Sequence, residues 1–468
     1  MNKLTIDDLL KAVDYQSYSL VEGLDQEIES VEFDSRKIIA KSLFVPLVGG
    51  SRDGHEYVQM AIENGANVCF WSNSEETAPK GRIHVIYVKD TLKAMQELAS
   101  YYRQLVDPIV IAITGSNGKT TSKDMTAMSL TSKYQVYKTQ GNYNNEIGMP
   151  YTILQMPSST QVLVLEMGMN HFGEIHRLSC IAQIDVAIIT LIGESHIEYL
   201  GSRQGIAQAK MEILDGLKEE GIFLYPQNEP LIANLLEKQT RKLKSYTFGM
   251  DSQADFYAFD IEEDYDRTYF KTNIDGNVLC TIPVMGSYNV TNALIALAVS
   301  KLLDVPTEQA IFQLSQFKLT ANRLQWLKGK TGAKILNDAY NASPTSMRAV
   351  LASLSNINRE ESGRKIVVLG DILELGDKSC DYHRQLATGL DPESIDKVYL
   401  FGHEMAALYE VLTSKFDEEN IYYEANSHQK LITALEQEVR PNDIVLLKSS
   451  FSVDLLQVVT ALTGIETY

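Results

Sequence analysis

A short glycine-rich stretch near residue 115 has the residue types and spacing of a phosphate-binding loop. In the segment IAITGSNGKTTSKDM, residues 111–125, an apolar run leads into Gly115, and Gly118, Lys119 and Thr120 precede a segment of helical character. Glycines let backbone N–H groups close around phosphate oxygens, a lysine neutralises their charge, and a threonine hydroxyl can bind magnesium. The loop departs from the common G-x-x-x-x-G-K-[ST] pattern, because an isoleucine stands at the position of its first glycine. The predicted nucleotide-binding residues of the loop are Gly115, Ser116, Asn117, Gly118, Lys119, Thr120 and Thr121.

Four other side chains could contact a nucleotide or a metal ion bound at such a loop. Glu166, in QVLVLEMG, and Asp338, in AKILNDAY, each lie at the end of an apolar run typical of a buried strand. Ligands of open α/β sheets bind at the carboxyl ends of strands, so either carboxylate could contact a ligand, and Glu166 could hold a metal. His196 and Lys210 carry weaker signals, because a lone histidine is usually structural and a lysine on a helix is usually solvated. Their spacing alone does not make them site residues.

Asparagines gather at two places. NYNNEIGMP brings Asn142, Asn144 and Asn145 into a turn, where asparagine is common without any binding function. GSYNVTNAL places Asn289 and Asn292 three residues apart at the start of a predicted helix. Two side-chain amides could face one ligand there, or one of them could cap the helix. The residues by themselves leave both interpretations open.

The elements that must position these residues predict an α/β fold class with three domains. SLFVPLVGG, HVIYVKD and the helical segment EYVQMAIENGA indicate a small α/β domain at residues 1–88. From DPIVIAITG onward, strand, glycine-rich turn and helix alternate through QVLVLEMG and DVAIITLIG, which predicts a central doubly wound mononucleotide-binding domain at residues 89–315. AKILNDAY, RKIVVLGDILELG, DKVYLFG and DIVLLKSS alternate with helical stretches such as SPTSMRAVLASL, so residues 316–468 should form a Rossmann-like domain.

The composition excludes several classes of function. Lys and Arg number 42 against 61 acidic residues, and the resulting formal charge of −19 argues against sequence-independent binding to nucleic acid or to anionic membranes. No apolar run approaches the roughly 18 residues of a membrane-spanning helix, and the amino terminus lacks the apolar core of a signal peptide. The four cysteines form no C-x-x-C pair, so neither a zinc site nor a disulfide framework is indicated. We expect a cytoplasmic monomer with no nucleic-acid partner and no membrane insertion.

Taken together, the motifs occur in an order that resembles the Mur ligases, the ATP-dependent amide ligases of peptidoglycan precursor synthesis. TGSNGKTT, NYNNEIG, LEMG, GESHIEYLGS with AKMEI, GSYNVTNAL and NDAYNASPTS follow one another as in that family, over essentially the whole chain. The family also uses a short T-G-x-x-G-K-T loop. FDSRKIIAKSLFVPLVGG, MNHFGEI and VVLGDILELG resemble most closely the member that joins D-alanyl-D-alanine to UDP-N-acetylmuramoyl-tripeptide through an acyl phosphate. The resemblance implies these two substrates, ATP and Mg²⁺, with two ions bound.

The resemblance also implies roles for single residues. Lys119, Glu166, His196 and Lys210 would be catalytic, and the metal ligands would be Thr120, Glu166, His196 and Lys210 as a carbamate. A neutral amine captures CO2, and the resulting anion can approach magnesium as an ammonium group cannot. Further ATP contacts would be Asn289, Asn292, Arg323 and Asp338. Ser35, Arg36, Gly54 and His55 would contact the UDP end of the acceptor, and Asn142, Asn144 and Asn145 would also be substrate-binding residues.

Two stretches depart from the family pattern, at three positions in all. Tyr288 stands where relatives often have a histidine before the first adenine-side asparagine. In KSSFS, Ser449 and Phe451 stand for the glycine and the arginine of K-G-S-R-S, although Lys448 is retained. A contribution of Phe451 to substrate binding cannot therefore be carried over from the family.

Three other functions compete with this interpretation. A sister Mur ligase that adds the third peptide residue, or a folylpolyglutamate synthetase, would share the ATP-binding motifs. The first domain discriminates against the folate enzymes, which lack a comparable uridine-binding module. A nucleotide-binding regulator without catalysis would not need Glu166, His196 and Lys210 together. The identity of the third acceptor residue, lysine or diaminopimelate, stays open.

Overall fold

The computed structural model describes residues 3–50, 52–264, 266–276, 278–320, 322–359 and 362–466. The chain divides into two compact units, which are described separately. The first unit comprises Met1–Thr114, Lys133–Ile188 and Glu212–Phe223, and the second comprises Gly115–Ser132, Ile189–Met211 and Leu224–Tyr468. No helix within the described ranges is both long enough and apolar enough to cross a membrane.

A five-stranded sheet forms the amino-terminal part of the first unit. Its order is β2 (Tyr15–Ser19), β7 (His84–Val88), β6 (Ala66–Trp71), β5 (Ser42–Phe44) and β4 (Ser30–Glu32). The strands β4 to β7 are parallel, whereas β2 pairs with β7 in the antiparallel direction. Every residue of β6 and β7 is buried, as expected for parallel strands covered on both faces. The short strands β1 (Leu4–Thr5) and β3 (Glu27–Ile28) and the helices α1 (Ile6–Ala12) and α2 (Val58–Glu63) accompany this sheet.

Parallel strands that lead to the glycine-rich loop form the rest of the first unit. β10 (Val162–Glu166) pairs in parallel with β8 (Ile109–Thr114) and with β9 (Val136–Lys138), and β11 (Ile184–Ile189) is the other neighbour of β8. The helices of this part are α3 (Thr91–Val106), α5 (Gly148–Gln155) and α6 (Glu174–Ala182). Glu166 is the last residue of β10, so the prediction that it lies at the carboxyl end of a strand is confirmed.

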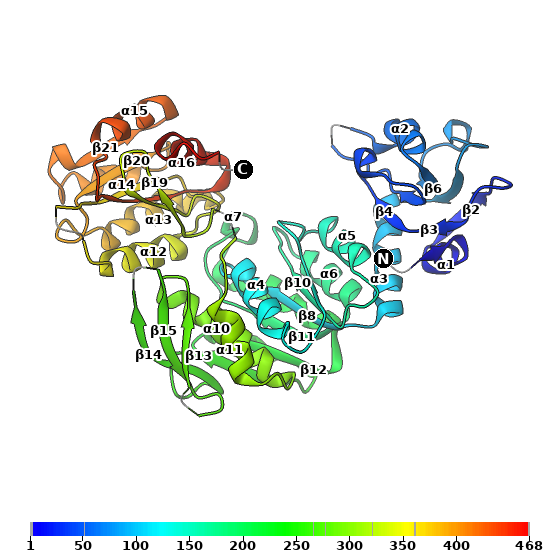
Figure 1. Cartoon of the computed structure of the whole chain (residues 1–468), viewed down its shortest axis with the longest axis horizontal. Helices are drawn as coiled ribbons and strands as arrows, with labels where there is room; N and C mark the ends of the chain where they lie inside the picture. Colours follow the sequence, from blue (N-terminus) through cyan, green and yellow to red (C-terminus); the bar gives the residue numbers. More distant parts are fainter. Residues whose placement is uncertain are drawn as a thin grey trace. The chain divides into compact units, whose positions relative to one another are not determined.

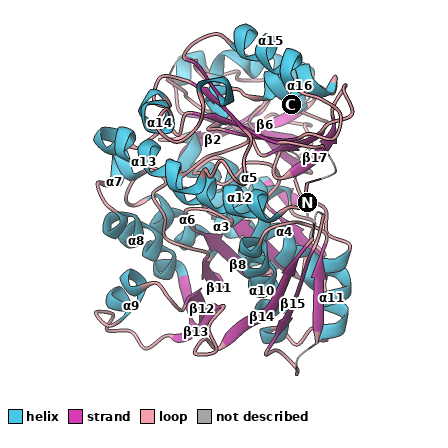
Figure 2. Cartoon of the chain, turned by 90° about the vertical axis from the view of Figure 1, so that its left-hand side faces the viewer, coloured by secondary structure: helices cyan, strands magenta, loops and turns pink. Residues whose placement is uncertain are grey.

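In the second unit, the helix after the glycine-rich loop packs against a second long helix. α4 (Lys119–Leu130) contacts α10 (Ser287–Leu302), where the Ser300 hydroxyl donates to Ser129 Oγ at 2.9 Å. α10 and α11 (Thr307–Ser315) lie against strands of an antiparallel ribbon (Figure 2). Its strands are β14 (Phe256–Glu263), β15 (Thr268–Thr272) and β16 (Leu279–Ile282), and β13 (Lys244–Gly249) is parallel to β14. Residues alternate in burial along β15, because one face of an antiparallel sheet can meet water.

Shorter elements connect these parts of the central region. α7 (Ile197–Leu200) and α8 (Arg203–Met211) follow β11 and lie in the second unit. β12 (Leu217–Pro226) begins in the first unit and ends in the second, and α9 (Pro230–Leu236) follows it. Glu229 caps α9 by accepting from the Leu231 N–H, and Pro230 stands at the first helical position.

The carboxyl-terminal part of the second unit is a six-stranded sheet covered by helices on both faces. The order is β17 (Gln325–Lys328), β18 (Lys334–Asn337), β22 (Ile444–Lys448), β19 (Lys365–Gly370), β20 (Lys397–Phe401) and β21 (Ile421–Glu424). Only β17 is antiparallel to its neighbour among these strands. α15 (His428–Glu438) and α16 (Leu456–Thr463) lie on one face, and α12 (Pro344–Asn356) and α13 (Ser379–Gln385) lie on the other, with α14 (Ala406–Leu412) after β20 (Figure 1). The predicted Rossmann-like arrangement of this region is confirmed.

Candidate active site

Two glycines set the backbone of the loop before α4. Gly118 is the N-cap of α4 with a φ of 79°, which glycine adopts without strain. A Cβ atom at Gly118 would lie 2.6 Å from Asn292 Oδ1, and one at Gly115 would lie 1.8 Å from Thr190 Oγ1. No side chain fits at either position. A left-handed glycine at a helix N-terminus brings successive N–H groups into a concavity that binds anions, so this loop has the geometry of a phosphate cradle.

The segment after β11 braces this loop. The Ser116 N–H donates to the Leu191 carbonyl at 2.9 Å, and the Gly193 N–H donates to Ser116 Oγ at 2.8 Å. The Thr190 hydroxyl donates to the Asn117 carbonyl at 2.5 Å. The Lys119 ammonium folds back and donates to the Gly115 carbonyl at 2.9 Å. These hydrogen bonds to neighbouring protein groups therefore fix the conformation of the loop.

Asn289 and Asn292 tie α10 to α4. Asn292 Nδ2 donates to Asn289 Oδ1 at 3.0 Å, and the Ser122 hydroxyl donates to Asn292 Oδ1 at 2.9 Å. Both asparagines are buried, and Gly286 occupies the N-cap position of α10. The alternative that an asparagine caps this helix is therefore wrong. Their contact with ATP stays a prediction.

Lys210 lies in α8 with 2% of its surface exposed. Burial, and then repulsion from the nearby Lys119 ammonium, holds the pKa of Lys210 well below its usual range. A buried lysine beside a second lysine favours its neutral amine, which is the form that reacts with CO2. The structure thus gives Lys210 a property that its position in the sequence did not reveal.

Arg323 and Asp338 lie close together in the second unit. Arg323 Nη2 donates to Thr120 Oγ1 at 3.2 Å, and its guanidinium lies 4.4 Å from the centre of the Tyr340 ring. Asp338 accepts from the Leu324 N–H at 3.2 Å and from the Lys448 ammonium at 2.5 Å. Two predicted ATP-binding residues from the third region are thus assembled, and the first of them reaches the phosphate loop.

The two departures from the family pattern also lie in this neighbourhood. Burial, and then the negative charge of Asp338, raises the pKa of Tyr288 well above its usual range. Phe451 is 58% exposed, and its ring centre lies 5.6 Å from that of Tyr340. Ser449 is buried.

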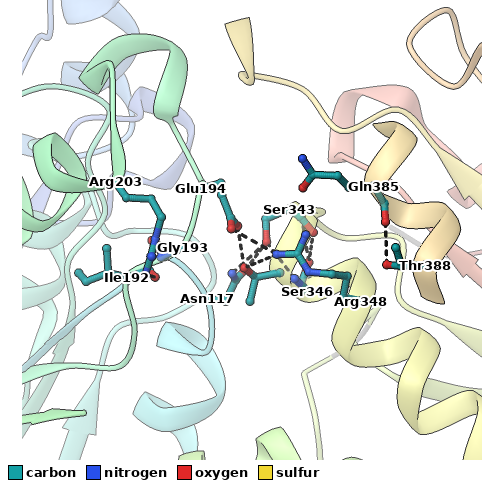
Figure 3. Close-up of polar contacts among 12 residues, drawn as sticks. Asn117, Ile192, Gly193, Glu194, Arg203, Ser343, Ser346, Arg348, Gln385 and Thr388 are labelled. Atoms are coloured by element: carbon teal, nitrogen blue, oxygen red, sulfur yellow. Dashed lines mark hydrogen bonds and ion pairs between the residues drawn. The ribbon is translucent and has the colours of Figure 1, made fainter. Parts of the chain in front are cut away.

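The amino-terminal end of α12 contacts the glycine-rich loop and the loop after β11. It does so through residues that the sequence analysis did not single out. Ser343, the N-cap of α12, accepts from Asn117 Nδ2 at 2.9 Å and lies 3.1 Å from Asn117 Oδ1. In the same turn, the Thr345 hydroxyl donates to Glu194 Oε2 at 2.6 Å, and in the next turn Arg348 Nη2 lies 3.3 Å from Glu194 Oε1 (Figure 3). The start of α12 was predictable from the serine and proline there, but its partners are more than 150 residues away in the sequence.

In the first unit, Asn144 contacts Glu166. The buried Glu166 accepts from Asn144 Nδ2 at 2.8 Å, and its backbone N–H donates to Thr139 Oγ1 at 3.0 Å. Asn145 has a structural function, because its Oδ1 accepts from the Gly148 N–H at 2.8 Å at the start of α5. Asn142 is exposed. Of the three asparagines in this turn, Asn144 is the one that the structure brings to the carboxylate.

The residues predicted to contact the UDP end of the acceptor flank α2 in the first unit. Ser35 is buried beside Met60 of α2, and the exposed Arg36 pairs with Asp34 at 2.8 Å. Gly54 precedes α2, and a Cβ there would lie 2.6 Å from the Leu47 backbone. Both ring nitrogens of His55 have protein partners. Nδ1 lies 2.5 Å from Asp53 Oδ1, and Nε2 accepts from the Ser72 N–H at 3.2 Å.

The donor set suits magnesium held largely by phosphates. Within the described ranges, no three or more His, Cys, Asp or Glu residues are grouped closely enough to hold a metal ion. Mg²⁺ usually takes one or two protein ligands and completes its octahedron with phosphate oxygens and waters. Thr120 in the first turn of α4 and His196 after β11 would each supply one ligand, and the buried Lys210 would supply one only as a carbamate, so the residues present fit the ion.

Comparison with known families covers most of the chain. The Mur ligase middle domain matches residues 113–300, the Mur ligase glutamate ligase domain matches residues 322–451, and the Mur ligase family catalytic domain matches residues 27–103. The UDP-N-acetylmuramoyl-tripeptide–D-alanyl-D-alanine ligase of Bacillus subtilis (strain 168) is 40% identical over 432 residues, which are 92% of each chain.

Solved structures agree with this similarity. The structure of MurF from Acinetobacter baumannii matches with a TM-score of 0.88 at 29% identity and covers 99% of this chain and 100% of that one. The MurF ligase of Thermotoga maritima, solved in complex with ADP, matches with a TM-score of 0.81 at 27% identity and covers 93% of this chain and 97% of that one. Both comparisons extend over all three predicted domains.

Proposed function

This chain belongs to the Mur ligase family, and we propose that it is an ATP-dependent ligase joining D-alanyl-D-alanine to the carboxylate of UDP-N-acetylmuramoyl-tripeptide. The observation that carries the use of ATP is the glycine cradle before α4, with Lys119 and Thr120 in the first helical turn, and the choice of substrates is supported by the similarity to the D-alanyl-D-alanine ligases. Such a ligase forms a C–N bond at the expense of ATP in peptidoglycan precursor synthesis.

The first step prepares the acceptor carboxylate for attack. A free carboxylate has no good leaving group, so one of its oxygens attacks the γ-phosphorus of ATP. The bond from that phosphorus to the oxygen that bridges the β- and γ-phosphates breaks. ADP is the leaving group, and the acceptor becomes an acyl phosphate. Lys119 and the N–H groups at the start of α4 would stabilise the charge on the phosphates. Arg323 reaches Thr120 and would contact the nucleotide from the third region.

Magnesium, when bound, would neutralise charge on the transferring phosphoryl group. We propose Thr120, Glu166, His196 and a carbamate of Lys210 as its protein ligands, for two ions. Burial supports the last assignment, because it favours the neutral amine of Lys210 that carbamate formation requires. Asn144 would hold the Glu166 carboxylate in place through its 2.8 Å hydrogen bond.

The second step forms the amide. The neutral amino group of D-alanyl-D-alanine attacks the acyl carbon, and phosphate leaves from the tetrahedral intermediate as the amine loses a proton. We propose that Ser35, Arg36, Gly54 and His55 form the end of the acceptor site that holds UDP. Because His55 already has protein partners on both nitrogens, we expect it to shape this site rather than to contact the ligand through its ring.

The test is phosphate release from ATP with magnesium, offering the UDP-linked tripeptide and D-alanyl-D-alanine together and each alone. Release that needs both substrates, with one dipeptide mass added to the acceptor, would support the proposal. Lys119→Ala should abolish release, whereas Lys238→Ala, which removes an exposed charge after α9, should not. Full activity of Lys119→Ala would refute the function assigned to that lysine.

The same assay separates the competing functions. Release that depends on another amine or another acceptor would indicate a sister ligase or a folylpolyglutamate synthetase. Nucleotide binding without turnover would favour a regulator. We also propose that the protein acts in the cytoplasm as a monomer, for which sedimentation equilibrium should give the mass of one chain.

A further inference from the structure

Glu374, in the loop after β19, contacts His196, in the loop after β11. Its Oε2 lies 2.6 Å from His196 Nδ1. That nitrogen is buried, and the contact has the distance but not the angles of a standard hydrogen bond, so we describe it as a close contact between the carboxylate and the ring. In the part of the chain that the structure describes, we find no protein hydrogen bond to Nε2 of the same ring. One ring nitrogen therefore faces a carboxylate, and the other remains available.

The backbone at both residues is unusual. His196 has a φ of 64° and Glu374 a φ of 63°, in the left-handed region that non-glycine residues rarely adopt. The two turns are joined by a backbone hydrogen bond, in which the Glu198 N–H donates to the Glu374 carbonyl at 3.2 Å. Left-handed residues that persist in a fold cluster at functional sites, because surrounding contacts must hold them there. Here two such residues meet side chain to side chain.

We propose that Glu374 is a positioning residue that orients the His196 imidazole and keeps its proton on Nδ1, so that the Nε2 lone pair is directed at magnesium. The inference rests on the proposed function of His196 as a magnesium ligand. A histidine that binds a metal through one ring nitrogen usually donates a hydrogen bond from the other ring N–H to a carboxylate or carbonyl. That bond fixes both the tautomer and the ring orientation.

The contact makes the third region part of the metal site. Glu374 belongs to the region after residue 316, whereas His196 belongs to the central region, and α12 joins the same two regions through Glu194. A metal ligand oriented in this way is in place only when the third region is seated against the loop after β11.

The plain alternative is that Glu374 only helps to seat the third region. Arg348 provides the matched control, because its contact with Glu194 joins the same regions without touching His196. Arg348→Met removes that ion pair and retains the bulk of the side chain. A purely structural function of Glu374 would make the Arg348 and Glu374 variants behave alike.

Two substitutions of Glu374 separate its charge from its reach. Glu374→Gln keeps an oxygen that can accept from Nδ1, and Glu374→Asn is too short to reach the ring but tolerates the left-handed backbone. Histidine labelled with ¹⁵N reports the tautomer of His196 by NMR without metal, after assignment with His196→Ala. Electron paramagnetic resonance of free Mn²⁺ reports metal binding in the presence of ADP.

We expect the wild-type protein and Glu374→Gln to carry the Nδ1 proton. Glu374→Asn should mix the tautomers and weaken Mn²⁺ binding about 10- to 100-fold, the usual effect of removing such a partner. Arg348→Met should change neither quantity. An Nε2 proton in the wild-type protein, unchanged Mn²⁺ affinity in Glu374→Asn, or an equal loss in Arg348→Met would each overturn the proposal. Unchanged Mn²⁺ binding in His196→Ala would instead refute the metal-binding function of His196 itself.

Discussion

Replacing Gly118 with alanine should damage the phosphate loop in a way that can be measured without substrates. Gly118 has a φ of 79°, and a Cβ there would lie 2.6 Å from Asn292 Oδ1. That oxygen cannot retreat freely, because it accepts from the Ser122 hydroxyl and the same amide donates to Asn289. The added methyl group therefore meets a side chain that is fixed by two hydrogen bonds, one with Ser122 of α4 and one with Asn289 inside α10.

The expected cost has two parts. Left-handed backbone costs an alanine about 1–2 kcal/mol relative to glycine. If Asn292 is displaced, its two hydrogen bonds are lost, and each is worth about 0.5–1.5 kcal/mol. The loss of local stability at the start of α4, where it packs on α10, should therefore be about 2–5 kcal/mol.

Gly173 is the matched control. It caps the start of α6 with a φ of 84°, close to that of Gly118, and a Cβ there would meet no atom within 4 Å. Gly173→Ala should therefore cost only the backbone part. Hydrogen exchange followed by mass spectrometry measures the opening free energy of each helix separately, which suits a chain of several domains. Calorimetry with ADP should show weaker binding for Gly118→Ala alone.

Equal losses of stability in the two variants would refute this reasoning. Such a result would mean that Asn292 moves aside without cost and that the contact with Gly118 does not constrain the loop. Unchanged ADP affinity in Gly118→Ala would separately contradict the identification of this loop as the phosphate cradle.

Three further predictions follow from buried charged groups. Because burial lowers the pKa of Lys210, its amine should capture CO2. Removal of CO2 or acidification should therefore reduce activity. In NMR with ¹³CO2, a carbamate signal should appear for the wild-type protein and vanish in Lys210→Ala. Asp338→Ala leaves the buried Lys448 without its carboxylate partner and should destabilise the protein by about 3 kcal/mol in urea unfolding, with a smaller loss in the Asp338→Ala, Lys448→Met double variant. Burial raises the pKa of Glu32, so the folded state binds this proton more tightly than the unfolded state and loses stability as pH rises above about 4. Glu32→Gln should therefore stabilise the protein at neutral pH and flatten the dependence of its stability on pH. A pH profile of stability parallel to that of the wild-type protein would contradict this prediction.

Local patterns in the sequence predicted the elements that carry the site. The phosphate-binding loop was predicted from Gly115, Gly118 and Lys119, because glycines and a lysine between an apolar run and a helix are typical of such a loop. Glu166 was placed at the end of its strand by the uninterrupted run of apolar residues before it. The antiparallel strands β14, β15 and β16 were not predicted, because their alternating pattern is weak beside the strong apolar runs of the parallel strands.

Other residues were understood through the family resemblance and not through their own spacing. Lys210 looked like an ordinary surface lysine of a helix until the structure placed it at 2% exposure beside Lys119. Asn289 and Asn292 left ligand binding and helix capping open, and the structure excludes capping because Gly286 is the N-cap of α10 and both asparagines lie inside the helix. In each case the decisive fact was the surroundings of the side chain.

What the sequence determined by itself was the order of the elements and the chemistry of the phosphate loop, since both depend on residues close together in the chain. Only the tertiary structure decided which distant side chains complete the site. The pairs Glu194 with Arg348 and His196 with Glu374 each join segments more than 150 residues apart. No local propensity encodes such a partner, because its position is fixed by the packing of whole sheets and helices against one another.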